Sequence, residues 1–414
     1  MRFAPMSTLF WVIGCAILVG FAPAASGDRS PGEPRQGLYV VDPTSPSPKL
    51  LVPGERDDPA WSPDGRWLVS YDAAAYGVNL DVVDSAGANR HRVGSIRWSH
   101  RGSLVAYTNA KTRTLSIGSS DWRVTRLVEP RAGSDPIAWS PDDHRLLYGS
   151  GRSGGTWSGL ATVDANGAHR RKILAHSVVS ASWSPDGKAL AIMDFPQHLG
   201  VMASAGGKLR RLPGTWEGWP YPDWSLDGRS LIVYPAQAVS STGGFDAVQL
   251  LVTSGARRVL CKQCPAFVFS PDGQSIAFTD ATNTLWLEKG DGTGKRRVAK
   301  PVFTPSWSPD SHSLVFSIPD ADGVHASVAI ADATTGAVRK LTDGTHSDRP
   351  LGGVSADGTF VAFERFLGES AGQELWIVGA DGTGAHRVMA FGTCSLAAWS
   401  PAHPLLAVTN LDDC

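Results

Sequence analysis

The sequence of 414 residues predicts an all-β protein that folds as a single closed β-propeller of four-stranded blades. The first observation is a motif, Trp-Ser-Pro-Asp-Gly at residues 61–65, which returns at intervals of about 37 to 47 residues. The second is a strand–turn–strand pattern that alternates with this motif, as in "TVDANGAHRRKIL" at residues 162–174. The third is that no segment carries an apolar period long enough for a helix.

The motif marks the end of the first strand of each blade and the turn into the second. Its nine copies are centred on Trp61, Trp98, Trp139, Trp183, Trp224, Phe269, Trp307, Val354 and Trp399. Proline presets φ for a turn, aspartate bonds nearby backbone and glycine accepts a positive φ. We expect the aromatic residue to pack between neighbouring sheets, so that the motif is scaffold. A calcium-binding or ligand-binding role for the Asp64-type residues is the alternative.

The two ends of the repeat region are complementary halves of one blade. Residues 37–52 resemble a third and fourth strand with no first pair before them, and residues 394–410 resemble a first pair with nothing after it. Pairing these halves would close the ring and remove its sheet edges. Eight whole units and this composite give nine blades, or eight if the Trp98 unit, whose turn is altered, is degenerate. The propeller is expected to span residues 37–414, after a flexible mature N-terminus of residues 25–36.

Charge excludes one class of partner. The chain has 38 Lys and Arg against 39 Asp and Glu, for a net charge of −1. A nucleic-acid surface needs a basic excess, so no nucleic-acid partner is predicted.

Residues 1–24 are predicted to be a secretory signal peptide. An apolar run extends from about Thr8 to Phe21, and a small-residue cleavage site ends at Ala24. The run is shorter than the roughly 20 residues of a membrane span, so a retained anchor is only an alternative. A second alternative is a lipoprotein, because the residues before Cys15 resemble a lipoprotein box. Each outcome places the protein in the periplasm or outside the cell, and cleavage after Ala24 would leave no integral span in the mature chain.

The cysteines are consistent with export. Four remain after cleavage: Cys261, Cys264, Cys394 and Cys414. An even number in an exported chain predicts disulfides, here Cys261–Cys264 in a small loop and Cys394–Cys414 across a predicted hairpin. A redox pair or a zinc site is the alternative. The first would need a thioredoxin-like βαβ context and the second would need two more ligands near Cys261, and neither is evident.

These residues resemble the repeats of the TolB-type propellers, whose hallmark is W-S-P-D-G followed by a D-x-x-G-x-x-x-R-x-L strand pair. The resemblance covers residues 37–414, and the chain is expected to lack the α/β domain that precedes the propeller in TolB proper. Similar repeats occur in propeller domains of peptidases and in some polysaccharide lyases. The resemblance therefore implies the fold and leaves the role open.

The candidate binding residues lie in the variable connections between blades and between second and third strands. Such loops on a rigid frame are a usual place for binding. They are an aromatic group, Trp216, Trp219 and Tyr221; a set of carboxylates before innermost strands, Asp58, Asp135, Asp223 and Asp348; and Arg349. The aromatic group could form a platform for a sugar or peptide, or pack on the neighbouring blade. The carboxylates could ring the channel mouth, or be solvated turn residues.

No catalytic residue, metal ligand or cofactor is assigned. Residues 368–372 match the esterase pattern G-x-S-x-G, but a predicted strand rather than a helix follows. The sequence therefore predicts a monomeric, exported, non-catalytic binding scaffold of the bacterial cell envelope. Its expected partner is an envelope protein, or alternatively a glycan, on the loop face. The competing hypothesis is a lyase or hydrolase at the channel mouth, which would gather His346, Asp348 and Arg349 with Asp135 and Arg152 around one pocket.

Overall fold

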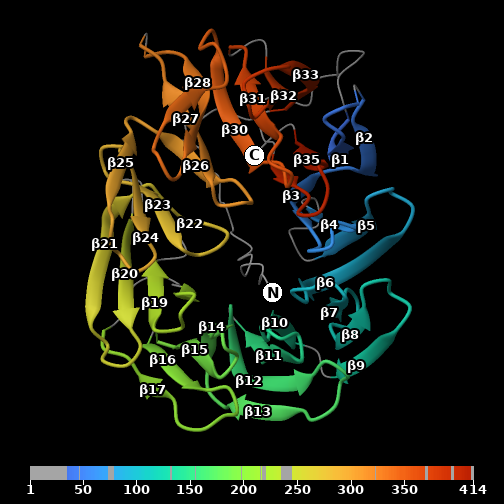
Figure 1. Ribbon diagram of the computed structural model, residues 1–414. Helices are drawn as coiled ribbons and strands as arrows, with labels where there is room; N and C mark the ends of the chain where they lie inside the picture. Colours follow the sequence, from blue (N-terminus) through green and yellow to red (C-terminus); the bar gives the residue numbers. More distant parts are fainter. Residues whose placement is uncertain are drawn as a thin grey trace.

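The computed structural model describes residues 35–411, apart from 46, 73–78, 131–132, 154, 197, 215, 217–220, 235–244, 322, 369–371 and 393–395. The described residues form strands β1 to β35 and no helix. The strands lie in antiparallel sheets that follow one another around a central axis (Figure 1). The architecture is all-β, as the sequence predicts, and is consistent with a propeller.

The strands group into sets of four that run from the axis to the outer edge (Figure 1). In the first half of the chain the sets are β3 (Arg56–Trp61), β4 (Trp67–Asp72), β5 (Leu80–Asp84) and β6 (Arg90–Trp98); β6 with β7 (Leu104–Asn109), β8 (Leu115–Ser119) and β9 (Thr125–Glu129); β10 (Asp135–Trp139), β11 (Arg145–Ser153), β12 (Thr156–Asp164) and β13 (Arg171–Leu174); and β14 (Val178–Trp183), β15 (Ala189–Asp194), β16 (His198–Ala203) and β17 (Arg210–Arg211).

The second half repeats this arrangement. Its sets are β18 (Tyr221–Trp224), β19 (Ser230–Tyr234), β20 (Phe245–Leu251) and β21 (Arg257–Cys264); β22 (Ala266–Phe269), β23 (Ser275–Thr279), β24 (Leu285–Lys289) and β25 (Arg296–Ala299); β26 (Phe303–Trp307), β27 (Ser313–Pro319), β28 (Ala326–Asp332) and β29 (Val338–Lys340); and β30 (Ser347–Val354), β31 (Phe360–Phe366), β32 (Gln373–Gly379) and β33 (His386–Phe391). Strand β6 serves two sets, because its first residues pair with β5 and its last residues pair with β7.

The two ends of the described chain share one sheet. Its order is β2 (Lys49–Pro53), β1 (Gly37–Val41), β35 (Leu406–Asn410) and β34 (Ala397–Trp399). Strand β1 pairs with β35 in continuous antiparallel register, from Gly37 opposite Asn410 to Val41 opposite Leu406. The pairing of the two half-blades that the sequence predicts is therefore confirmed.

Each residue of the Ser-Pro-Asp-Gly turn has a defined role, as the copy at residues 184–187 illustrates. The Ser184 hydroxyl donates to Asp186 Oδ1 (2.6 Å) and accepts from the backbone N–H of Ala189 (2.9 Å). Gly187 has a φ of 69°, a conformation that favours glycine. The same Ser–Asp bond recurs at Ser62, Ser140, Ser225, Ser270, Ser308 and Ser355. The motif thus closes its own turn with its own polar groups.

The motif tryptophans join neighbouring sets. The indole N–H of Trp61 donates to the Ala398 carbonyl (2.8 Å), and that of Trp139 donates to the Arg97 carbonyl (3.0 Å). Equivalent bonds to the preceding set are made by Trp183, Trp224, Trp307 and Trp399. Because these rings also pack between the sheets, the repeated motif is a structural unit.

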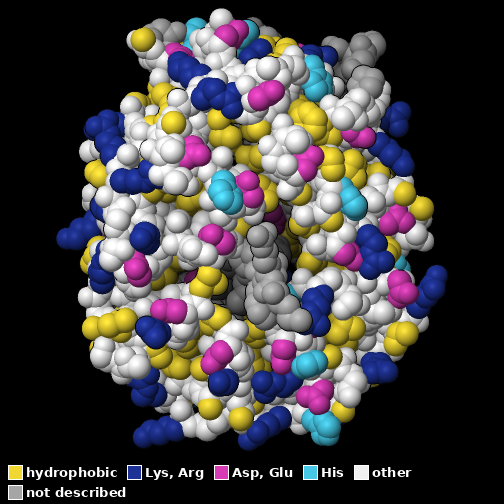
Figure 2. Space-filling view, in the orientation of Figure 1, with side chains coloured by type: hydrophobic (Ala, Val, Ile, Leu, Met, Phe, Trp, Pro, Cys, Tyr) yellow, Lys and Arg dark blue, Asp and Glu magenta, His cyan; other side chains and the backbone are white. Residues whose placement is uncertain are grey.

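The basic fourth strands have a matching role at the outer edge. Lys49 Nζ donates to the Ala86 carbonyl (2.6 Å), and Arg126 Nη1 donates to the Asn166 carbonyl (3.0 Å). Cations at corresponding places in later sets, which also reach a turn carbonyl of the following set, are Arg210, Arg258, Arg296 and Arg339. Figure 2 shows Lys and Arg side chains gathered mostly along the outer rim. The basic residues of the repeat are therefore used within the fold.

The turn aspartates predict a loss of stability in acid. The Ser184 hydroxyl and the Lys188 N–H lower the pKa of Asp186 below its ordinary value of 3.8. Partial burial by itself would raise the pKa of four further turn aspartates. Hydrogen bonds from the motif serine and from a backbone N–H outweigh burial and lower the pKa of Asp142, Asp227, Asp310 and Asp357. A lowered folded-state pKa stabilises the fold above the unfolded pKa, and this stability is lost as pH falls through the folded value. We expect the free energy of unfolding to fall below about pH 4.

Guanidinium denaturation between about pH 2 and 6 measures this effect, since the carboxylates titrate there. Ser184→Ala is the matched control, because removing the hydroxyl raises the pKa of Asp186 and should weaken the acid dependence. A free energy of unfolding that stays constant throughout would contradict the expectation.

A disulfide joins Cys261 and Cys264 at the end of β21, with Cα atoms 6.1 Å apart, as the sequence predicts. Both side chains are buried. Cys394 and Cys414, the other predicted pair, lie outside the described residues. Chain-entropy arguments for so short a loop give a stabilisation of about 2 kcal/mol. We expect dithiothreitol to remove this amount in a Cys394→Ala/Cys414→Ala background, measured by urea denaturation. The same background carrying Cys261→Ala and Cys264→Ala should not respond; if it does, the effect has another source.

Candidate functional site

The two ends of the strand sets differ in character. Because consecutive strands are antiparallel, the Ser-Pro-Asp-Gly turns and the turns between third and fourth strands emerge at one end, here named the turn face. The remaining connections emerge at the other end, here named the loop face, and they vary in length and sequence. Among the candidate binding residues chosen from the sequence, Asp135 and Asp348 lie where β10 and β30 begin, at the loop face.

A cavity of about 340 Å³ opens on the loop face between the sets β26–β29 and β30–β33. We name it the loop-face cleft; its lining residues are Phe303, Ser317, Ala326, Ser347, Asp348, Arg349, Glu364, Phe366 and Gln373. They come from strand ends of both sets. Two of the sequence-predicted residues, the chain neighbours Asp348 and Arg349, therefore line this cleft.

The floor of the cleft is a buried ion pair. The Asp348 side chain is 0% exposed, and Arg365 Nε and Nη2 each donate to one of its carboxylate oxygens at 2.8 Å. The guanidinium of Arg365 also stacks on the Trp376 ring, 4.5 Å from its centre. Its hydrogen bonds to Asp348 raise the pKa of Arg365, against the opposing effect of burial. Asp348 is thus fixed in place by a bidentate partner.

A second carboxylate in the cleft is also paired. Arg349 Nη2 donates to Glu364 Oε2 at 2.7 Å. Glu364 is buried, whereas about half of the Arg349 side chain is exposed at 54%. The cleft therefore presents a guanidinium edge at its mouth and carries no unpaired carboxylate among its lining residues.

The walls of the cleft are apolar. Phe303 and Phe366 are 44% and 40% exposed, which is unusual for phenylalanine. The Gln373 side-chain oxygen is buried and lacks a hydrogen-bond partner. A buried acceptor without a donor is costly, and a bound ligand with an N–H group would relieve it. The arrangement suits an apolar side chain flanked by a hydrogen-bond donor.

The other predicted carboxylates lie in other sets. Asp135, at the start of β10, accepts from Arg152 Nη1 (3.2 Å) and from the Trp157 indole (3.4 Å). Asp58 lies in β3, where burial and then the Asp57 charge raise the pKa of its carboxyl. Asp223 lies in β18. The structure therefore places Asp135 and Arg152 together, but they do not line the cleft that contains Asp348.

The predicted aromatic platform is not supported at Trp216. This residue is 8% exposed and belongs to a core cluster that includes Leu231 and Val248. The Arg257 guanidinium covers its ring at 4.9 Å. Trp216 thus packs against neighbouring strands, which is the alternative interpretation, and offers no open face. Trp219 lies outside the described residues, and Tyr221 is the first residue of β18.

Seven of the nine lining residues of the cleft were not chosen from the sequence, and three of them form its walls and its unpaired acceptor: Phe303, Phe366 and Gln373. The one available signal was the variable segment at residues 364–373, which contains the last two. Serine 370 of the esterase-like pattern lies outside the described residues. Within the described part of the chain, no group of three or more His, Cys, Asp or Glu side chains could hold a metal ion. No helix there is long and apolar enough to cross a membrane.

Comparisons with known proteins identify the repeat. The family model of the TolB beta propeller domain matches residues 174–403, more than half of the chain. Among curated proteins, none matches the sequence.

Solved structures resemble the chain at low sequence identity. A crystal structure of the eukaryotic initiation factor is 11% identical, covers 86% of this chain and 97% of its own, and has a TM-score of 0.57, so it shares the fold. A protein described as TolB from Agrobacterium tumefaciens is 19% identical over 59% of this chain and 94% of its own, with a TM-score of 0.35. An oligogalacturonate lyase in complex with manganese is 17% identical over 77% and 96%, with a TM-score of 0.39.

Proposed function

Because the chain belongs to the TolB beta propeller domain family, we propose that it is an exported, non-catalytic binding scaffold of the bacterial cell envelope. A partner protein docks on its loop face, at the loop-face cleft. The signal-peptide pattern of residues 1–24 supports export, which cell fractionation would test. The four-strand sets support a closed ring of nine blades. The Trp98 unit, whose altered turn raised the possibility of eight, contributes the regular strands β6 to β9.

One observation carries the proposal: the cleft combines exposed aromatic walls with neutralised carboxylates. Asp348 and Glu364 are each paired with a guanidinium of this chain. Phe303 and Phe366 instead offer apolar surface, which at protein interfaces supplies much of the binding energy. Gln373 adds an acceptor for a backbone or side-chain N–H of the partner.

Site-specific photocrosslinking tests this proposal. A photoreactive amino acid at Phe366 should give a discrete protein adduct in living cells, and the same residue at Val259, equally exposed on the outer strand β21, should not. Phe303→Ser should abolish the adduct without changing the melting temperature, since this side chain is half exposed. Identical adducts from both positions, or adducts that survive Phe303→Ser, would count against a partner in the cleft.

A second candidate function is a lyase or hydrolase at the channel mouth. The observation that favours it is Asp58, whose pKa is raised by burial and by Asp57, a property of general acids. Its positive φ of 51° lies where β3 slips register against β4, so the strand irregularity offers a structural reason for its position. Glycan-cleavage assays with Asp58→Asn test it. Activity that depends on Asp58 would favour the enzyme over the scaffold.

A further inference from the structure

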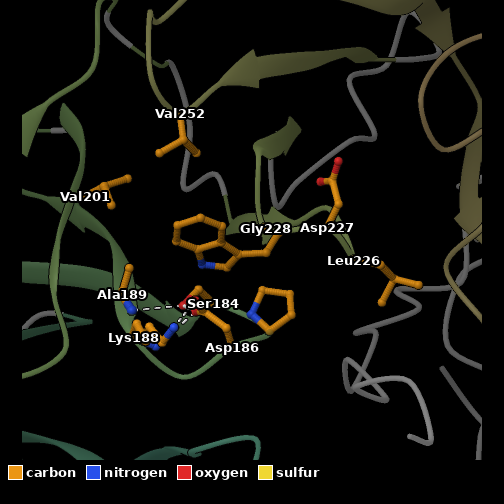
Figure 3. A pocket seen from close by; sticks show the side chains of 11 residues that line it. Ser184, Asp186, Lys188, Ala189, Val201, Leu226, Asp227, Gly228 and Val252 are labelled. Carbon is orange, nitrogen blue, oxygen red and sulfur yellow. Dashed lines mark hydrogen bonds and ion pairs between the residues drawn. The ribbon is translucent and has the colours of Figure 1, made fainter. Parts of the chain in front are cut away.

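The turn face contains a crevice between two successive Ser-Pro-Asp-Gly turns. It has a volume of about 220 Å³ and separates the set β14–β17 from the set β18–β21. Figure 3 shows Ala189 on one side and Leu226 on the opposite side, with Val201 and Val252 also lining the space. The motif tryptophan Trp224 completes the lining. The crevice therefore exposes an indole between apolar side chains.

The equivalent place one set earlier is occupied by an arginine of this chain. Arg145 is the fifth residue after Ser140, the serine of its motif copy. Its guanidinium lies over the ring of the next motif tryptophan, Trp183, 5.0 Å from the ring centre. Arg145 Nη2 also lies 3.4 Å from the Gly187 carbonyl and 3.5 Å from the Ser204 hydroxyl. The repeat thus contains a built cation–π site that the protein fills itself.

The crevice is open because the residue at the position of Arg145 in this set, Ala189, is small. Ala189 is the fifth residue after Ser184, where Arg145 stands in the preceding set. Trp67 occupies the same motif position in another set, and its ring contacts Trp122 of the next set at 6.0 Å between centres. A side chain that ends at Cβ leaves the face of Trp224 uncovered. The space beside Trp224 is therefore the counterpart of the one that Arg145 fills over Trp183 in the preceding set.

The polar groups around the crevice match a cation. No described residue donates a hydrogen bond to the Gly228 carbonyl, which corresponds to Gly187, because Val252 stands where Ser204 would donate. Asp186 and Asp227 also line the crevice, and both carboxylates are 58% exposed. A guanidinium could therefore bond a carbonyl and lie beside carboxylates while stacking on the indole.

The cations already near these carboxylates are loosely held. Lys188 Nζ lies 3.9 Å from Asp186, and Arg229 Nε lies 4.0 Å from Asp227. Both basic side chains are 84% exposed. Exposed ion pairs of this length contribute little energy, so an incoming guanidinium can displace them.

We propose that this crevice binds an arginine side chain of a partner protein, as a second contact on the face opposite the loop-face cleft. The bound guanidinium would occupy over Trp224 the position that Arg145 occupies over Trp183. The proposal is independent of what the loop-face cleft binds.

The test uses the peptide acetyl-Gly-Arg-Gly-amide and its neutral analogue with citrulline in place of arginine. Isothermal titration calorimetry should show one arginine-peptide site on the wild-type protein and about tenfold weaker binding of the citrulline peptide, a difference between those of exposed and desolvated cation–π contacts. Ala189→Arg should abolish this site by supplying the guanidinium internally. Arg145→Ala should create a second site over Trp183.

NMR of the indole N–H signals, assigned by Trp→Phe variants, locates each site at Trp224 or Trp183. Circular dichroism melts confirm that each variant is folded, and Ala189→Leu, which fills the space with a neutral side chain, serves if Ala189→Arg does not fold. Equal binding of the two peptides, or unchanged binding after Ala189 is enlarged, would overturn the proposal. So would an Arg145→Ala variant that gains no second site.

Discussion

Replacing Trp183 with alanine is expected to lower the free energy of unfolding by about 3–5 kcal/mol, the usual cost of removing a large buried aromatic side chain. The side chain is 0% exposed and belongs to a core cluster with Leu147 and Leu190. Its N–H donates to the Ala138 carbonyl (3.3 Å), and Arg145 stacks on its ring. The substitution therefore leaves a cavity, an unpaired carbonyl and a cation without its ring.

Urea denaturation monitored by circular dichroism measures this loss. Trp224→Ala is the matched control, because Trp224 holds the same motif position but is half buried and borders the turn-face crevice. Its loss should be clearly smaller. A similar loss in the two variants would mean that burial does not set the contribution of the motif tryptophan.

Asp348→Ala is expected to lower the free energy of unfolding by about 3–5 kcal/mol, because it leaves the guanidinium of a buried ion pair uncompensated. The Arg365 side chain is only 12% exposed and is confined by the rings of Phe363 and Trp376. The loss should exceed that of Glu364→Ala, since Arg349, the partner of Glu364, can turn to solvent.

The double variant Asp348→Ala/Arg365→Met distinguishes pairing from packing. Removing both charges should recover part of the stability lost in the single variant, and a double-mutant cycle gives the coupling energy. The contrary outcome is additivity: the double variant would be less stable than Asp348→Ala by the whole amount that Arg365→Met costs in the wild-type protein. In that case the two side chains do not interact as the structure indicates.

Much of the architecture was predictable because its determinants are local. Serine, aspartate and glycine of the motif bond within five residues of one another, so a short segment specifies the turn wherever it occurs. The pairing of β1 with β35 was predictable for a different reason: two incomplete halves of a known unit have one arrangement that completes it.

The candidate site was predictable only in part because its determinants are distant in the chain. Asp348 was chosen because it was expected shortly before an innermost strand, and the structure places it within β30. Phe303 joins it only through the packing of two sets. For Trp216 the sequence left a binding platform and packing on the neighbouring blade both open, because an aromatic residue in a loop can face solvent or the core. Its burial depends on Leu231 and Val248, which local sequence does not place beside it. Likewise, the sequence alone does not show that Ala189 borders a crevice. The crevice is recognised only when Ala189 is compared with Arg145, which covers a tryptophan ring at the corresponding place.

The direction of the tryptophan bonds has a consequence for how such rings assemble. Each of the motif tryptophan bonds described above reaches backwards to the preceding set, so the units that they join associate head to tail, as in a heterologous interface. A linear array of this kind would leave an orphan donor at one terminus and an orphan acceptor at the other. The bond from Trp61 to Ala398, residues 337 positions apart, satisfies both at once. The same bond thus serves the junction between the two chain ends and junctions within the chain, whereas Trp98 Nε1 has no hydrogen-bond partner among the described residues and Phe269 and Val354 have no indole N–H, so those units are joined without it.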